Sequence, residues 1–130
     1  MTLDDKDRRI VVELEMKKSA ENLAQARLAA EHGYWDLVAN RLYYSVFHAV
    51  AALLVFNRLK VMSHKGSVML FNRHFLKEGI IPLEEGRIFS LLQTRREEAD
   101  YNCWFEVDEE EMKTLIPRAE SLIKTIQQLL

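Results

Sequence analysis

Two residues suited to phosphate chemistry, Arg41 and His48, stand seven positions apart in the segment RLYYSVFH. On an α-helix that spacing is nearly two turns, so both side chains share a face about 10 Å apart along the axis. Tyr44 and Ser45 lie between them on this face. A guanidinium, a phenol, a hydroxyl and an imidazole together could bind a phosphate and move a proton near neutral pH. The alternative is an arginine and a histidine whose polar groups are satisfied inside a bundle or at an interface.

A second polar group stands in TRREEADYN, residues 94–102. Arg96 and Asp100 are four apart and can pair on one helix face. A buried Arg96 would need an anion, and Asp100 is the candidate in the same segment. We hypothesise that Arg96, Asp100 and Tyr101, with Arg95 beside them, share one polar cleft with the Arg41–His48 face. The alternative is a solvated helix face.

The charges are unevenly distributed, although the net charge is only −2. Residues 37–77 hold six Lys or Arg and no acid, whereas residues 78–130 hold six Lys or Arg and twelve Asp or Glu. A local positive field of this kind attracts phosphates. His64 and Lys65 follow Ser63, a good N-cap residue, so they could hold a phosphate at a helix N-terminus. Alternatively, these cations neutralise acidic parts of the same molecule or of a second copy.

The elements that must position these residues are helices. Only four glycines and two prolines interrupt the chain, and no segment alternates convincingly between apolar and polar residues. We predict helices over residues 3–32, 34–59, 64–77, about 82–103 and from 108 onward, with Gly33 and Gly79 as helix ends and Pro117 as a kink or restart. The prediction is one domain, residues 1–130, folded as an all-α, antiparallel up-and-down bundle of about five helices.

The core is predicted from the helical spacing of apolar residues. The second helix offers Leu42, Val46, Ala49, Val50 and Leu53, and the last helix offers a long apolar stripe that begins at Met112. On the first helix the expected core residues are Met16, Ala20, Leu23 and Ala30. The small residues Ala49, Ala51 and Ala52 could allow close approach of a second copy in a homodimer.

The remaining sequence features indicate the cellular compartment and whether a cofactor is bound. The single cysteine, Cys103, cannot form an internal disulfide, and the charged N-terminus MTLDDKDRR has no signal-peptide core. The longest apolar stretch, residues 49–56, is too short to span a bilayer. We therefore expect a cytoplasmic protein without membrane contact. The sequence shows no nucleotide-binding glycine motif and no metal-ligand spacing, so no cofactor and no metal are predicted.

The segments RLYYSVFHAVAALL, HKGSVMLFNRHFLKEG and RREEADY, in this order, resemble the small stand-alone HEPN-domain proteins of bacteria and archaea. The resemblance extends from about Met16 to the C-terminus. It implies a helical bundle that forms homodimers. It also implies a minimal nucleotidyltransferase as partner, in a pair that behaves as a toxin–antitoxin system.

Many members of the HEPN family that this chain resembles are metal-independent endoribonucleases. Their sequence motif is an arginine and a histidine with four to six residues between them. Arg41 and His48 satisfy this spacing with six intervening residues. In the ribonucleases, however, the motif lies on a late helix. The matching segment here has Arg95 or Arg96, but Tyr101 stands where the histidine is expected. We therefore predict a module of a toxin–antitoxin-like or regulatory pair that binds nucleotide or RNA, with an endoribonuclease using Arg41 and His48 as the alternative.

Overall fold

The computed structural model describes residues 3–61 and 63–130, and in this part of the chain every regular element is a helix. The elements are α1 (Asp5–Glu31), α2 (Trp35–Phe56), α3 (His64–Phe71), the π-helical turn η1 (Asn72–Leu76), α4 (Leu83–Gly86), α5 (Ile88–Tyr101) and α6 (Glu109–Gln128). The predicted all-α helical bundle is confirmed.

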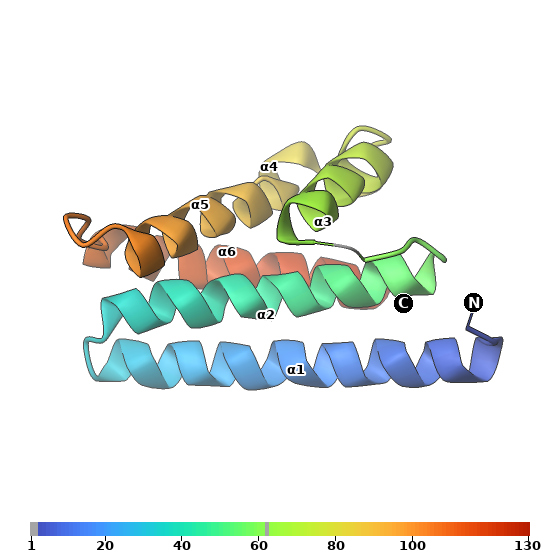
Figure 1. Ribbon diagram of the computed structural model, residues 1–130, viewed down its shortest axis with the longest axis horizontal. Coiled ribbons are helices and arrows are strands. Elements are labelled where there is room, and N and C mark those ends of the chain that lie inside the picture. The colour runs from blue at the N-terminus through green and yellow to red at the C-terminus, as the bar shows by residue number, and fades with distance from the viewer. Residues whose placement is uncertain (1–2, 62) are drawn as a thin grey trace.

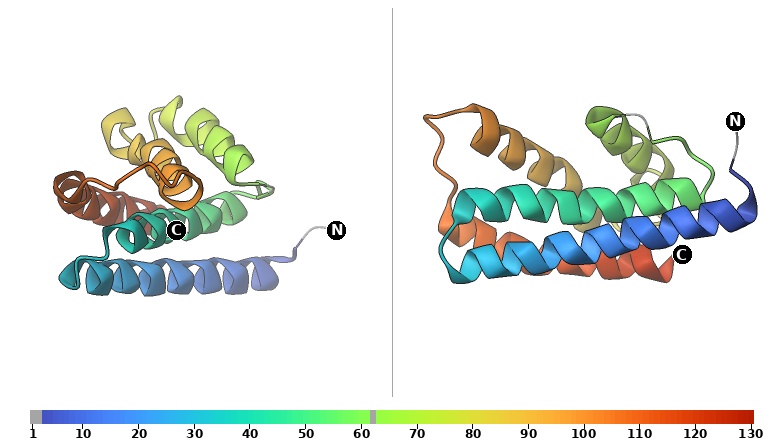
Figure 2. Two further views of the ribbon diagram at one scale, coloured as in Figure 1. Left: turned by 60° about the vertical axis from the view of Figure 1, so that its left-hand side comes forward. Right: turned by 60° about the horizontal axis from the view of Figure 1, so that its bottom comes forward.

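The helices form layers around α2 (Figure 1). Helix α1 lies along one side of α2 and runs in the opposite direction, whereas α3, α4 and α5 lie on the other side. Helix α6 lies behind α2 and runs in the same direction (Figures 1 and 2). Of all the helices, α2 is thus the one that reaches α1, α3, α5 and α6.

The central position of α2 follows from its side chains. Its predicted core residues Leu42, Val46, Ala49, Val50 and Leu53 are all fully buried. The expectation for α1 was partly wrong, because Ala20 is exposed, while Val12, Ser19, Asn22, Ala26 and Ala29 are the buried residues of that helix. This inner face carries small and polar side chains, which hydrophobic spacing alone does not reveal.

Local signals at the helix ends are confirmed. Gly33 ends α1 with a φ of 73°, which glycine adopts without the steric cost of a Cβ atom. Ser63 caps α3 by accepting a hydrogen bond from the backbone N–H of Gly66 at 2.9 Å. Asp108 caps α6 by accepting one from Glu110 N–H at 3.0 Å. These caps determine the residue at which each helix begins.

Three helix expectations were imprecise. The predicted helix 64–77 passes into the π-helical turn η1, and the predicted helix 82–103 is divided at Arg87 into α4 and α5. Helix α6 continues through Pro117 without a restart. Proline removes one backbone donor from a helix, but burial of the α6 face on either side of Pro117 outweighs that loss.

The alanines offered for a subunit interface are buried within this chain, with Ala51 4% exposed and Ala52 fully covered. Ala52 follows Ser45 by seven residues and so shares the side of α2 that meets α1. By length and composition alone α2 could cross a membrane. Its most apolar window is nevertheless 67% buried inside the bundle, as the central helix of a bundle would be.

Candidate functional site

A cleft of about 590 Å³ opens between α2, α3 and α5. Its walls are polar or aromatic: Tyr44, Ser63, His64, Lys65, Gln93, Arg96, Glu97 and Tyr101. Five of these residues were predicted as binding residues, so the structure brings together segments about fifty positions apart. We call this hollow the Arg96 cleft.

Arg96 is the unusual residue of the cleft. Its side chain is only 8% exposed, and its guanidinium carbon lies 4.8 Å from the ring centre of Tyr43 and 5.8 Å from that of Tyr44. Both positions suit a cation–π contact. The Nε atom has no hydrogen-bond partner among the described residues. A buried guanidinium with unused donors is a site that favours an anion.

The predicted pairing of Arg96 with Asp100 exists, but it is loose. Arg96 Nη1 lies 3.6 Å from Asp100 Oδ2, and Arg96 Nη2 lies 3.9 Å from Glu97 Oε1. Both distances are too long for hydrogen bonds. The same Asp100 oxygen accepts a hydrogen bond from Asn40 at 3.3 Å. The two carboxylates therefore balance the charge of Arg96 without using its hydrogen-bond donors.

The floor of the cleft is held by a tyrosine–histidine pair. The Tyr43 hydroxyl lies 2.7 Å from His64 Nδ1, and the His64 ring packs on Phe47 at a centroid distance of 4.7 Å. Burial lowers the pKa of His64, and the nearby charge of Arg96 lowers it further. Burial raises the pKa of Tyr43. At neutral pH His64 is therefore uncharged, and its Nδ1 accepts a hydrogen bond from the Tyr43 hydroxyl, so the pair holds the start of α3 without adding charge.

The first turn of α3 forms one rim of the cleft. Ser63 and Lys65 line it beside His64, and Lys65 is exposed. The free backbone N–H groups at a helix N-terminus carry partial positive charge. Here that charge acts beside the Lys65 ammonium and the Arg96 guanidinium, so three positive groups face one hollow.

Arg41 and His48 lie elsewhere, along the seam between α1 and α2. Arg41 donates to Asn22 Oδ1 at 3.1 Å and to Gln25 Oε1 at 3.3 Å. His48 Nδ1 lies 3.0 Å from Glu15 Oε2, with the two side chains 22% and 27% exposed. Neither residue lines the Arg96 cleft. Tyr44 links the two places, because its ring centre is 6.4 Å from that of His48.

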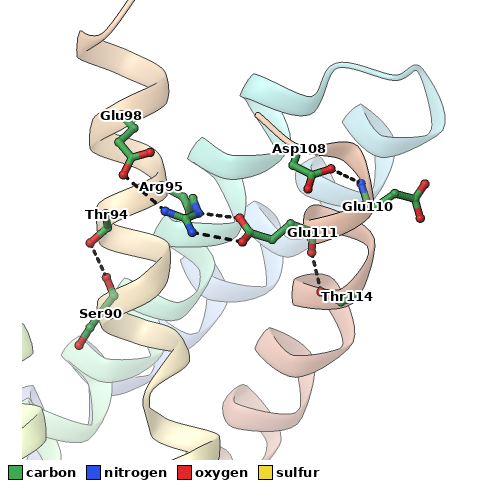
Figure 3. Close-up of polar contacts among 8 residues, drawn as sticks. All are labelled: Ser90, Thr94, Arg95, Glu98, Asp108, Glu110, Glu111 and Thr114. Carbon is green, nitrogen blue, oxygen red and sulfur yellow. Dashed lines mark hydrogen bonds and ion pairs between the residues drawn. The ribbon is translucent and has the colours of Figure 1, made fainter. Parts of the chain in front are cut away.

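Three more predicted residues do not line the cleft: Ser45, Arg95 and Asp100. Ser45 is fully buried, and its hydroxyl donates to the Leu42 carbonyl at 2.7 Å. Arg95 points the other way, toward α6, where it binds Glu111 with two hydrogen bonds of 2.6 and 3.2 Å (Figure 3). This hydrogen-bonded pair raises the pKa of Arg95. Both carboxylate oxygens of Glu111 are therefore occupied by Arg95.

The sequence interpretation missed Gln93 and Glu97 as lining residues. Gln93 stands three residues before Arg96, so helical spacing could have placed it on the same face. Glu15, the partner of His48, was also missed. Its signal was the antiparallel pairing of the first two helices, in which equal steps away from the turn lead from one contacting pair to the next.

Comparison with known proteins decides the family. A family profile for the HEPN domain matches residues 12–129. This chain belongs to the HEPN family. The resemblance seen in the sequence motifs is therefore confirmed over nearly the whole domain, and the match also includes most of α1.

Relatives of this HEPN domain match over almost their full lengths. The chain is 31% identical over 120 residues to a "UPF0332 protein" of Thermotoga maritima, covering 92% of this chain and 91% of the relative. It is 34% identical over 127 residues to "Putative toxin MJ0605" of Methanocaldococcus jannaschii, covering 97% and 93%. A second protein of that archaeon, "Putative toxin MJ0142", is 26% identical over 128 residues.

Proposed function

We propose that this HEPN domain is the toxin-like member of a regulatory pair and that it binds RNA or nucleotide phosphate in the Arg96 cleft. The observation that carries the proposal is the Arg96 guanidinium, which lines the cleft, lies over two tyrosine rings and has its nearest carboxylates only at 3.6 and 3.9 Å from its Nη atoms. A phosphate oxygen is the ligand that a guanidinium fork binds best.

The surroundings of Arg96 support an anionic ligand. The α3 N-terminus and Lys65 face the same hollow, and Tyr101 is 79% exposed at its edge. An exposed aromatic ring beside a positive hollow is the arrangement by which proteins stack a base while holding its phosphate. The nearby Glu97 and Asp100 carboxylates prevent a strong uncompensated charge when the cleft is empty.

The partner proposed for this domain is a minimal nucleotidyltransferase, with a homodimer as the form that acts. The toxin names of the two archaeal relatives support a toxin-like role, and such a role requires a neutralising partner. The seam that carries Arg41 and His48 lies at the surface of a single copy, where a second copy could reach it.

A growth experiment tests this proposal. We expect expression of the chain in a bacterial host to arrest growth, and co-expression of a nucleotidyltransferase encoded by the adjacent gene to relieve the arrest. The Arg96→Ala variant, expressed to the same level, should no longer arrest growth. Normal growth with the unaltered protein, or an arrest that Arg96→Ala leaves unchanged, would contradict the proposal.

A metal-independent endoribonuclease is the second candidate, and the His48–Glu15 pair favours it. A carboxylate 3.0 Å from Nδ1 holds the imidazole in one orientation, as a general base requires. Because Nδ1 faces Glu15, the other ring nitrogen is left for a ribose hydroxyl. Arg41, on the same side of α2, would then stabilise the charge that develops on the phosphate.

For this candidate we expect purified protein to cleave total RNA in the presence of chelator, and His48→Ala to reduce cleavage at least a hundredfold, within the ~10²–10⁴ range of a general base. The unfolding free energy should change by no more than about 1 kcal/mol, because His48 is partly exposed. The matched control is His32→Ala, since His32 is exposed at the end of α1. Equal cleavage by the His48→Ala protein would exclude His48 as the base.

A further inference from the structure

A second hollow lies beside the beginning of α5, whereas the Arg96 cleft lies beside the second half of that helix. It has a volume of about 380 Å³ and is lined by Asn72, Leu76, Lys77, Leu83, Arg87 and Ser90. It therefore sits where η1 meets the beginning of α5. Two of its lining residues, Lys77 and Arg87, are exposed cations. We call this hollow the Lys77 hollow.

The two hollows follow one groove. At one end, Lys65 of α3 shares the Arg96 cleft with Gln93 of α5. At the other end, Asn72 of η1 shares the Lys77 hollow with Ser90 of α5. Residue numbers rise along α3–η1 as they fall along α5, so these segments run antiparallel and the two hollows follow one another along them. Ser90 and Gln93 are less than one turn apart, so the hollows are adjacent.

Cationic side chains stand at both ends of this groove. Lys65 and Lys77 have no acidic side chain within ion-pair distance in residues 3–61 and 63–130. Arg87 pairs with Glu84 at 3.3 Å, but both side chains are largely exposed, with fractions of 61% and 87%. Such an exposed pair contributes little and is easily replaced by a phosphate. Glu97 is the acid that lines the groove, and it lies beside Arg96.

The length of the groove indicates how many nucleotides it can hold. From Arg87 to Arg96 is nine residues of helix, or about 14 Å at 1.5 Å per residue. At a rise of about 3.4 Å per nucleotide, this distance matches roughly four stacked nucleotides. A mononucleotide would occupy the Arg96 cleft and leave Lys77 and Arg87 unused. The spacing of the cations therefore fits a repeated anion.

We propose that the groove between α3–η1 and α5 binds a single-stranded RNA segment of about four nucleotides, with one phosphate at Arg96 and others at Lys77 and Arg87. Tyr101 stacks a base at the Arg96 end, since its ring is exposed and lines that hollow. The proposal rests on the proposed function for the Arg96 cleft and extends it from one phosphate to a strand. Single-stranded rather than duplex RNA fits, because the groove lies between two helices and exposes an aromatic ring for stacking.

The experiment measures binding of 5′-labelled single-stranded RNA of two, four, six and eight nucleotides by fluorescence anisotropy. With the unaltered protein, we expect affinity to rise about tenfold from two nucleotides to the four-to-six range and then to level off. The double variant Lys77→Ala, Arg87→Ala should bind the dinucleotide as before, but it should lose this rise. Its slope of log affinity against log salt should fall by about 0.7 for each cation removed.

The control is Lys124→Ala, which removes an exposed lysine from α6 and should leave every length unaffected. An affinity that does not depend on length, or a double variant that behaves like the unaltered protein, would overturn the strand proposal while leaving phosphate binding at Arg96 intact. Tighter binding of single-stranded DNA of equal length would overturn RNA as the occupant. Loss of all binding, dinucleotide included, in the unaltered protein would instead refute the proposed function.

Discussion

Replacement of Arg96 by alanine is expected to weaken RNA binding by about thirtyfold to a hundredfold. The guanidinium supplies charge-assisted hydrogen bonds to a phosphate from a site sheltered from water, and bonds to charged groups are worth about 1.5–3 kcal/mol. The two tyrosine rings hold the fork in place before the ligand arrives, so little rotamer entropy is lost on binding. Fluorescence anisotropy with a labelled RNA hexamer measures the effect.

The neighbouring arginine provides a matched control. Arg95→Ala also removes one guanidinium, but it breaks the two hydrogen bonds to Glu111 on the far side of α5. It should reduce the unfolding free energy by about 1–3 kcal/mol and leave RNA affinity within about threefold. Arg96→Lys, which keeps the charge but loses the planar fork, should fall between the two. Equal losses of affinity in Arg95→Ala and Arg96→Ala would show that only net charge matters.

The largest effect on stability is expected from Phe89→Ala, with a loss of about 3–5 kcal/mol of unfolding free energy. Phe89 is fully buried, stacks on Tyr43 at a centroid distance of 6.0 Å and meets Phe71 edge-on at 5.6 Å. Its removal leaves a cavity beneath the ring that supports Arg96. Urea unfolding followed by circular dichroism measures the change.

Leu14→Ala is the control for this loss, because Leu14 is 57% exposed on α1 and should cost less than about 0.5 kcal/mol. Phe89→Leu should be milder than Phe89→Ala and should keep the protein folded at room temperature. A loss in Phe89→Ala no greater than that in Leu14→Ala would mean that the ring does not pack as the structure has it.

Much of the fold could be predicted because it depends on local physics. The apolar spacing of α2 and α6, the caps Ser63 and Asp108 and the helix end at Gly33 are all short-range features. The π-helical turn and the division at Arg87 could not be predicted in this way. They arise where α3–η1 and α4 pack together, and Gly86 lies there close against Leu76.

The pairing of α1 with α2 was within reach of the sequence. Contacts follow matching steps away from Gly33: Asn22 with Arg41, Glu15 with His48, Arg8 with Val55 and Asp5 with Arg58. A step of seven residues toward the N-terminus of α1 is matched by a step of seven residues toward the C-terminus of α2, as two antiparallel helices require. This pairing takes Arg41 and His48 to the α1 side of α2, whereas the sequence interpretation had placed them in one cleft with Arg96, Asp100 and Tyr101.

The sequence by itself determined the helices, the central place of α2 and the candidates for the site, because helix spacing and capping are set within a few residues of each position. It counted Arg95 as a binding residue together with Arg96 and did not separate the two. One residue turns a helix by about 100°, so the side chains differ in direction, and only the packing of α5 against α2 decides which of them is buried. In the tertiary structure Arg96 is buried against Tyr43, Arg95 binds Glu111, and the start of α3 lines the cleft.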